Sequence, residues 1–299
     1  MSTRRDFLKT GALVAAGVAV GVTDAFAAIP VSRKGAPVVK LGCAAQSYQK
    51  PLRSGEMTLE GFIDLAAELG CDGVELTSYY WPKDFDRAYL NKIRRKCFLL
   101  GLDISASSVG NNFVQPAGPK RDESIALTKT WLQHCEEMGA PCMRVFGGSV
   151  PKDVSREQCL KWAIEGFEAC LPTAEKCGVI MAVENHGGMP ATAVEVIQIL
   201  DGVKSDWVGA NLDTGNFHTA DPYAEIKATA PYAVTTHYKT VVTPAGGKGG
   251  PADVKRIVSI LKDAGYRGYL TLEYEGAEDP KTAVPTAIKS MKEALGGVV

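Results

Sequence analysis

Four acidic or imidazole side chains close four successive apolar segments in the second half of the chain. In order along the sequence they are Glu184, Asp213, His237 and Glu273. Three carboxylates brought together at a low-dielectric core would repel one another and raise their own pKa values unless a cation bound between them. Three hard oxygen donors and one imidazole suit Mn²⁺, Mg²⁺ or Co²⁺ better than a thiol-rich structural zinc site would. The residue types therefore predict one divalent metal ion, provided that the fold brings the four side chains together.

The spacing of apolar segments predicts a fold that does so. Helical candidates separate the segments, for example Leu59 to Leu69, with apolar residues every three or four positions and a stop at Gly70. We expect eight strands, at Val38–Ala45, Gly73–Leu76, Leu102–Ser107, Cys142–Phe146, Val179–Glu184, Val208–Asp213, Val234–His237 and Tyr269–Glu273. Eight strand–helix units predict an α/β protein with a single (β/α)8 TIM barrel, whose strands all end at one mouth.

Length and composition agree with one large globular domain. The chain has 299 residues, of which 45% are hydrophobic and 22% charged, and the formal net charge is -1. This balance gives no broad positive field, so we expect no nucleic-acid partner. No linker divides residues 28–299, which we take as one barrel domain. The homo-oligomeric state is left open.

Residues 1–27 have the composition of an export signal. Arg4 and Arg5 precede an apolar run from Gly11 to Val22, and Ala25-Phe26-Ala27 offers a cleavage point after Ala27. The adjacent arginines resemble the twin-arginine signal, which implies export of the folded protein by the twin-arginine machinery to the bacterial periplasm. The apolar run is shorter than the ~20 residues of a spanning helix, so we expect no stable membrane insertion after processing.

The chain has eight cysteines, all of them after residue 27. An even number in an exported protein leaves disulfides open. The cysteines fall on predicted strands and helices, however, and none forms a Cys-x-x-Cys pair. We therefore expect buried free thiols.

The motifs around the four strand ends resemble those of the xylose isomerase-like TIM barrels, the sugar phosphate isomerase/epimerase superfamily. They are Val-Glu-Asn at 183–185, Leu-Asp-Thr-Gly-Asn at 212–216, His-Tyr-Lys at 237–239 and Leu-Glu-Tyr at 272–274. The resemblance implies a metal-dependent sugar isomerase or epimerase, with Mn²⁺ favoured over Mg²⁺, Co²⁺ or Zn²⁺. It implies that Glu184 and Glu273 bind the metal and also move a proton next to a carbonyl through an enediolate, whereas Asp213 and His237 are ligands only.

Three further residues are expected to bind substrate. Arg144, His186 and Lys239 would donate hydrogen bonds to the hydroxyls or to the enediolate oxygen of a sugar. Two positions depart from the epimerase pattern, because Asn216 stands where some epimerases have His and Thr240 where many relatives have Asp. The specificity of ketose 3-epimerases therefore does not transfer directly. Export favours free sugars, oxidised sugars or glycosides over phosphorylated sugars.

Three alternatives accompany this interpretation. A lyase or dehydratase acting on 3-keto-glycosides or keto-polyols would use the same site and the same first step. A non-catalytic sugar-binding module predicts loss of a ligand, and none is lost. The trinuclear zinc site of the related endonucleases needs several more His ligands, and before the fifth strand the chain offers only His134, which is expected in mid-helix within 131–138.

Overall fold

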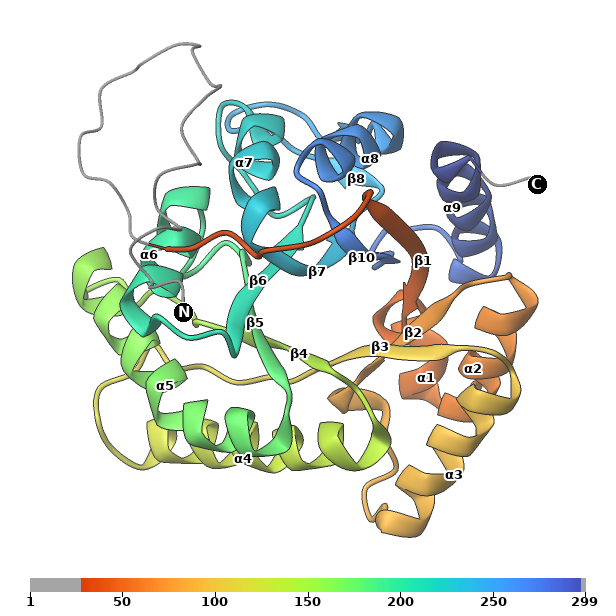
Figure 1. Ribbon diagram of the computed structural model, residues 1–299, viewed down its shortest axis with the longest axis horizontal. Coiled ribbons are helices and arrows are strands. Elements are labelled where there is room, and N and C mark those ends of the chain that lie inside the picture. Colours follow the sequence, from red (N-terminus) through yellow and green to blue (C-terminus); the bar gives the residue numbers. More distant parts are fainter. Residues whose placement is uncertain (1–27, 297–299) are drawn as a thin grey trace, which may run out of the picture.

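Eight parallel strands form a closed barrel, as the sequence predicts, and helices surround it (Figure 1). Going round the barrel, the order is β1, β10, β7, β6, β5, β4, β3 and β2. The strands are β1 (Val38–Ala44), β2 (Gly73–Thr77), β3 (Asp103–Ser108), β4 (Cys142–Phe146), β5 (Ile180–Glu184), β6 (Val208–Asp213), β7 (Ala233–Tyr238) and β10 (Arg267–Leu272). Each lies within one residue of its predicted bounds, apart from β10, which begins two residues early and ends one residue before Glu273.

The structure is a computed structural model that describes residues 28–296. The predicted signal segment 1–27 therefore lies outside the described residues. Among the described residues, no helix is both long enough and apolar enough to span a membrane.

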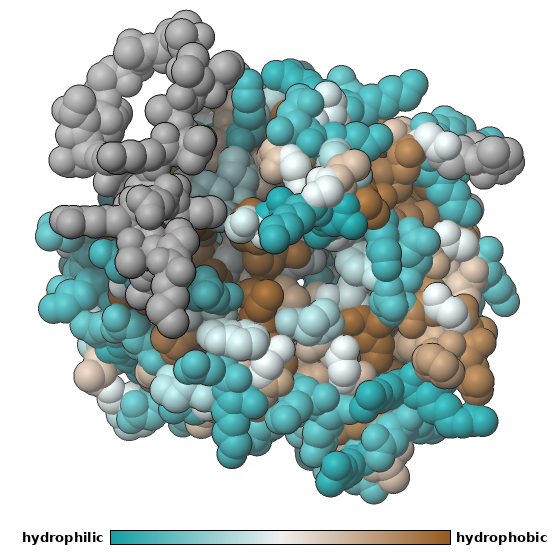
Figure 2. Space-filling view, viewed as in Figure 1, coloured by the Kyte–Doolittle hydropathy of each residue, from teal (hydrophilic) through white to brown (hydrophobic). Residues whose placement is uncertain are grey.

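The helices follow the strands in alternation, and their outer surfaces are mainly polar in the face shown in Figure 2. They are α1 (Gln49–Ser54), α2 (Leu59–Glu68), α3 (Arg87–Leu99), α4 (Pro119–Met138), α5 (Arg156–Cys177), α6 (Ala193–Val203), α7 (Pro222–Thr229), α8 (Val254–Asp263) and α9 (Pro280–Leu295). Short 3-10 turns lie at Ala45–Tyr48, Ser78–Tyr80 and Ala230–Tyr232, and a small antiparallel pair, β8 (Val241–Val242) and β9 (Gly250–Pro251), follows β7.

Local sequence explains where these helices begin and which face they bury. The side chains of Thr58, Ser155 and Asp253 accept hydrogen bonds from backbone N–H groups in the first turns of α2, α5 and α8. On α8, Ile257 and Leu261 are fully buried, one turn apart, against the barrel. The capping side chains thus fix where these helices begin, and an apolar stripe fixes the face that packs against the barrel.

Free cysteines contribute to this core. All eight are unpaired, and only Cys177 is partly exposed. The expectation of buried thiols is confirmed. His134 lies on α4, as expected, where its ring packs 5.0 Å from the ring of Phe85 and 5.3 Å from that of Trp131.

Residues 28–37 cross one side of the N-terminal end of the barrel and lead into β1 (Figure 1). The Val31 N–H donates to the carbonyl of Pro231, and the Val38 N–H donates to that of Tyr266, both at 3.0 Å. The Arg33 guanidinium donates to the carbonyl of Ala233 and lies over the Tyr266 ring. These contacts fasten the segment to the N-terminal end of the barrel, whereas the active sites of TIM barrels lie at the opposite end, where the strands terminate.

Candidate metal centre

The four strand-end residues meet at the carboxyl end of the barrel. Glu184 and Asp213 are the last residues of β5 and β6, His237 is the fifth residue of β7, and Glu273 directly follows β10. One ligand atom from each lies within 4.8 Å of the corresponding atoms of the others. All four side chains are buried, with at most 5% of any residue exposed. The register fixes this grouping, because Asp213 and His237 are directly paired across β6 and β7.

The imidazole of His237 is held between a carboxylate and the cluster. Its Nε2 lies 2.7 Å from Oε2 of Glu75, a fully buried residue on β2. Its Nδ1 faces the cluster, 3.3 Å from Glu273 Oε2 and 3.7 Å from Glu184 Oε1. With one proton kept on Nε2 beside Glu75, loss of the Nδ1 proton to a metal ion would leave the Nδ1 lone pair directed at the cluster, which is the usual arrangement of a metal-binding histidine. Burial alone would lower the pKa of His237, but Glu273 and Glu75 raise it well above its usual value.

Asp213 is held by backbone groups through one oxygen only. Its Oδ1 accepts hydrogen bonds from the N–H groups of Gly215, at 2.8 Å, and Asn216, at 3.2 Å. The side chain of Asn185 pairs with both backbone groups of Asp213. The second oxygen, Oδ2, is buried and accepts no hydrogen bond from any described residue. Burial, with Glu184 and Glu273 nearby, raises the pKa of Asp213 well above its usual value, despite Lys239.

Glu184 has a cationic partner of its own. Arg144 on β4 is 3% exposed, and its Nε lies 3.0 Å from Glu184 Oε2. Burial would raise the pKa of Glu184, but Arg144 and His237 lower it to about 2. Arg144 also donates from Nη1 to the carbonyl of Val109 at 3.0 Å. The guanidinium is thus fixed rather than pointing freely into solvent.

Glu273 is paired in a similar way with Lys239. The Lys239 Nζ lies 2.6 Å from Glu273 Oε2 and 2.5 Å from Glu275 Oε2. Burial would raise the pKa of Glu273, but His237 and Lys239 lower it well below its usual value. A Cβ on Gly215 would lie 2.5 Å from Lys239 side-chain carbons, so only glycine leaves room for this lysine to lie across the cluster.

These features fit a divalent cation. Of the three cluster carboxylates, Glu184 is paired with Arg144 and Glu273 with Lys239, whereas the unpartnered Oδ2 of Asp213 is 3.7 Å from Lys239. A buried acceptor without a donor is costly, and a cation at that point would relieve both the desolvation and the repulsion. The donor set of oxygens and one nitrogen is that of Mn²⁺, Mg²⁺, Co²⁺ or a catalytic Zn²⁺ site.

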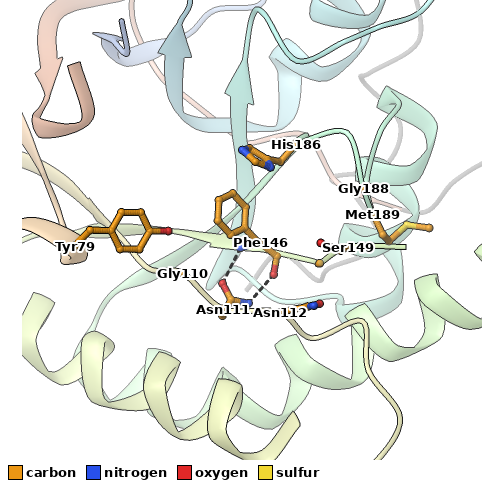
Figure 3. Close-up of a pocket in the computed structure, with 10 residues that line it drawn as sticks. Tyr79, Gly110, Asn111, Asn112, Phe146, Ser149, His186, Gly188 and Met189 are labelled. Atoms are coloured by element: carbon orange, nitrogen blue, oxygen red, sulfur yellow. Dashed lines mark hydrogen bonds between the residues drawn. The ribbon is translucent and has the colours of Figure 1, made fainter. Parts of the chain in front are cut away.

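The three expected substrate-binding residues lie in different settings. Arg144 and Lys239 contact the cluster carboxylates directly. His186, on the loop after β5, is exposed and packs on Phe146, with ring centroids 4.4 Å apart (Figure 3). It therefore lies over a cavity beside the cluster rather than within the cluster.

Two residues at the centre have no predicted role in the sequence. Glu75 lies in the middle of β2, two residues before the strand ends, so the rule of polar strand ends does not select it. Glu275 lies two residues beyond Glu273 and is partly exposed; its Oε1 accepts a hydrogen bond from Gln46 Nε2 at 2.9 Å. The signal for Glu75 is a carboxylate in an otherwise apolar strand, Gly-Val-Glu-Leu, which needs a buried partner.

Comparison with solved structures finds the same barrel at low sequence identity. The IOLI protein with a bound zinc atom has a TM-score of 0.72 and 20% identity, over 86% of this chain and 96% of that one. D-psicose 3-epimerase from Clostridium cellulolyticum H10, with D-tagatose, has values of 0.66 and 18%, over 87% and 93%. The apo form of 3-keto-D-glucoside 4-epimerase from E. coli has values of 0.67 and 16%, over 86% and 100%. At these identities the likeness shows the fold.

The sequence itself matches two family models, whereas comparison with curated proteins finds no match. Residues 1–21 match the twin-arginine translocation pathway signal sequence. Residues 63–294 match the xylose isomerase-like TIM barrel, which is most of the described barrel. The chain belongs to the xylose isomerase-like TIM barrel family and begins with a twin-arginine translocation signal.

Proposed function

We propose that the protein is a metal-dependent sugar isomerase or epimerase that moves a proton on the carbon next to a carbonyl. The observation that carries the proposal is the pair Glu184 and Glu273. Both reach the same buried cluster, from β5 and from the end of β10, and each has its own cation. The similarity of the fold to sugar epimerases supports the reaction class.

Glu184, Asp213, His237 and Glu273 would hold the metal, and Mn²⁺ suits this donor set well. When bound, a divalent ion supplies Lewis acidity toward a carbonyl oxygen. Asp213 and His237 act only as ligands in this scheme. Glu75 fixes the ring orientation of His237 through Nε2.

The two glutamates divide the proton transfer. Their lowered pKa values keep both in the carboxylate form at neutral pH, in which either can accept a proton from substrate. One would remove the proton from one face of the sugar carbon, and the other would return it on the opposite face. Arg144 and Lys239 neutralise these carboxylates and lie close enough to donate to substrate oxygens.

Deuterium incorporation tests this proposal. The Mn²⁺-loaded protein would be incubated in D₂O with a panel of free ketoses and 3-keto-glycosides and followed by NMR. Deuterium at the carbon next to the carbonyl, with the carbon skeleton retained, is the expected result. Loss of a substituent would instead identify the lyase alternative, and no exchange on any member of the panel would contradict a proton-transfer enzyme.

The signal sequence supports a second, separate proposal about location. The protein is exported folded and is cleaved after Ala27, which gives a periplasmic chain of residues 28–299. Replacing Arg4 and Arg5 together by Lys should leave the precursor in the cytoplasm. Fractionation and N-terminal sequencing of the exported form would check both points, and unchanged export of the double variant would argue for the general secretory route.

A further inference from the structure

A cavity of about 310 Å³ opens beside the metal centre, within the range of small-molecule sites (Figure 3). Its walls come from the segments that follow β2, β3, β4 and β5. The lining residues are Tyr79, Gly110, Asn111, Asn112, Phe146, Gly148, Ser149, His186, Gly188 and Met189. None of the four cluster residues is among them, so the cavity is a separate compartment at the same mouth.

Phe146 and Arg144 connect this cavity to the metal centre. Phe146 ends β4 in direct register with Glu184 on β5. The Arg144 guanidinium lies between the two, with its carbon 3.9 Å from the centroid of the Phe146 ring and its Nε 3.0 Å from Glu184 Oε2. A ligand that reaches the cluster therefore has the Phe146 ring immediately beside it, one guanidinium away from Glu184.

Three aromatic rings border the cavity. Figure 3 shows His186 above Phe146 and Tyr79 directed across the cavity toward it. Tyr79 is 44% exposed, so a ligand can still contact its ring. The Tyr79 ring can lie here only because residue 110 is glycine, since a Cβ at that residue would lie 2.7 Å from the ring. Exposed aromatic faces in a pocket favour ligands with a flat apolar side, and the C–H faces of a sugar ring provide one.

No lysine, arginine, aspartate or glutamate is among the residues that line the cavity. The side chain of Asn111 is not free to bind a ligand, because it forms hydrogen bonds with both backbone groups of Phe146. Asn112 accepts from the Val114 N–H through Oδ1, and its Nδ2 donates to no described side chain or backbone group. The Ser149 hydroxyl is exposed at the rim and has no described partner either. An amide donor and a hydroxyl suit sugar hydroxyls, whereas a phosphate would find no lysine or arginine among the lining residues.

We infer that this cavity binds a second, uncharged sugar ring, and that the substrates are glycosides whose first ring reacts at the metal centre. The inference rests on the proposed function, and it adds the substrate class and the residues that select it. The second ring would stack on the exposed Tyr79 ring, beside the packed pair of Phe146 and His186, and receive hydrogen bonds from Asn112 and Ser149.

Binding of unreactive sugars tests the inference without relying on turnover. Calorimetric titration of the Mn²⁺-loaded chain of residues 28–299 would compare cellobiose, maltose, sucrose and trehalose with the methyl glucosides. At least one disaccharide should bind about tenfold more tightly than the methyl glucosides. Tyr79→Ala should reduce that gain to about twofold or less, whereas Tyr79→Phe, which keeps the ring, should retain it. Phe98→Ala is the matched control, because Phe98 is an exposed aromatic residue on α3, outside the mouth.

Three results would overturn the inference. The first is that no disaccharide binds more tightly than the methyl glucosides. The second is that Tyr79→Ala keeps the full gain. The third is that glucose 6-phosphate shows the same gain, which would contradict a neutral second ring. The proposed function fails separately: a disaccharide gain that depends on Tyr79, with no deuterium exchange on any ketose or 3-keto-glycoside, would support the second-ring site and contradict the proposed reaction.

Discussion

Charged side chains are exposed to solvent at the N-terminal end of the barrel and buried at the carboxyl end. At the N-terminal end, Lys40 and Asp103 form an ion pair at 2.9 Å with side chains 46% and 58% exposed, and the Tyr269 hydroxyl joins them. At the carboxyl end, the metal-centre carboxylates are almost fully buried and crowd round His237. Exposed pairs remain hydrated and contribute little to stability, whereas buried charges cost several kcal/mol of desolvation per ion.

This difference indicates that the buried charges at the carboxyl end lower the stability of the fold. The N-terminal end could lose a charge with little consequence, since water can replace the partner. The carboxyl end keeps Glu184, Asp213, Glu273 and Glu75 near one imidazole, an arrangement that a fold selected for stability alone would not favour. Substitutions at the two ends should therefore differ in kind: those at the mouth should change chemistry, and those at the base should change stability slightly.

The largest effect is expected from the two glutamates that we assign to proton transfer. Glu184→Gln and Glu273→Gln keep a neutral oxygen but lose the basic carboxylate, so each should lower kcat by about 10²-fold or more. Asp103→Asn, the same chemical change at the base of the barrel, is the control. Steady-state kinetics at saturating Mn²⁺ would measure all three. Near-normal turnover by either glutamine variant would remove that residue from the catalytic pair.

Loss of a ligand that moves no proton should show in metal binding itself. Asp213→Ala and His237→Ala each remove one of four donors, and we expect at least about tenfold weaker Mn²⁺ binding, with a stoichiometry near one in the unchanged protein. Competition with a fluorescent chelator gives the affinity, and elemental analysis of protein purified without chelator gives the stoichiometry. Metal retained in full by both variants would rule out the assigned centre.

A residue one step removed from the metal should have an intermediate effect. Glu75→Gln replaces the carboxylate that accepts from His237 Nε2. Loss of such a partner typically weakens metal binding by about 10- to 100-fold. Because this range overlaps that of ligand removal, ¹⁵N NMR of the His237 ring adds a second reading, in which the proton should no longer be fixed on Nε2.

Ser105→Ala is the control for Glu75, because Ser105 is also a buried polar residue of the barrel and bonds only a backbone carbonyl, that of Val74. If Glu75→Gln and Ser105→Ala bind metal equally well and leave the ring proton in place, Glu75 has a purely structural role.

Much of the mouth could be predicted from the sequence because barrel strands end at a common edge. Once the strands are located, a polar residue that closes an apolar run must point into the mouth, and this rule places Glu184, Asp213 and Glu273 together. The rule fails for Glu75, which lies in mid-strand and meets His237 across the barrel interior. Only the closure of the barrel brings a side chain of β2 into contact with one of β7, and periodicity along one strand carries no such information.

The sequence also could not predict which charged side chains pair with each other. The substrate contact expected for Lys239 stays a prediction, whereas its ion pairs with Glu273 and Glu275 could not be predicted from the sequence. The cavity beside the centre depends on loop residues such as Tyr79 and Asn112, which follow strands without any periodic pattern. Their positions result from backbone turns and from close approaches such as that of Gly110 to Tyr79.

The smallest effect is expected at the base of the barrel, as a change in acid sensitivity. Hydrogen bonds from Tyr269 and Lys40 hold the pKa of Asp103 below its usual range. The unfolded chain therefore binds this proton at higher pH than the folded one, so the pair's stabilisation is complete above the unfolded pKa, ~3.9, and is lost as the pH falls through the folded pKa. Between pH 6 and pH 3, the free energy of unfolding should fall less in Asp103→Asn than in the unchanged protein. The difference should be below ~0.5 kcal/mol because the carboxylate is largely exposed.

Urea titrations at low and high salt measure this difference in the free energy of unfolding. Asp263→Asn, at an exposed position on α8, is the control, and screening should reduce the difference at high salt. A drop of several kcal/mol on removing Asp103 would show that the base of the barrel depends on its charges as strongly as the mouth does, and would overturn the contrast between the two ends.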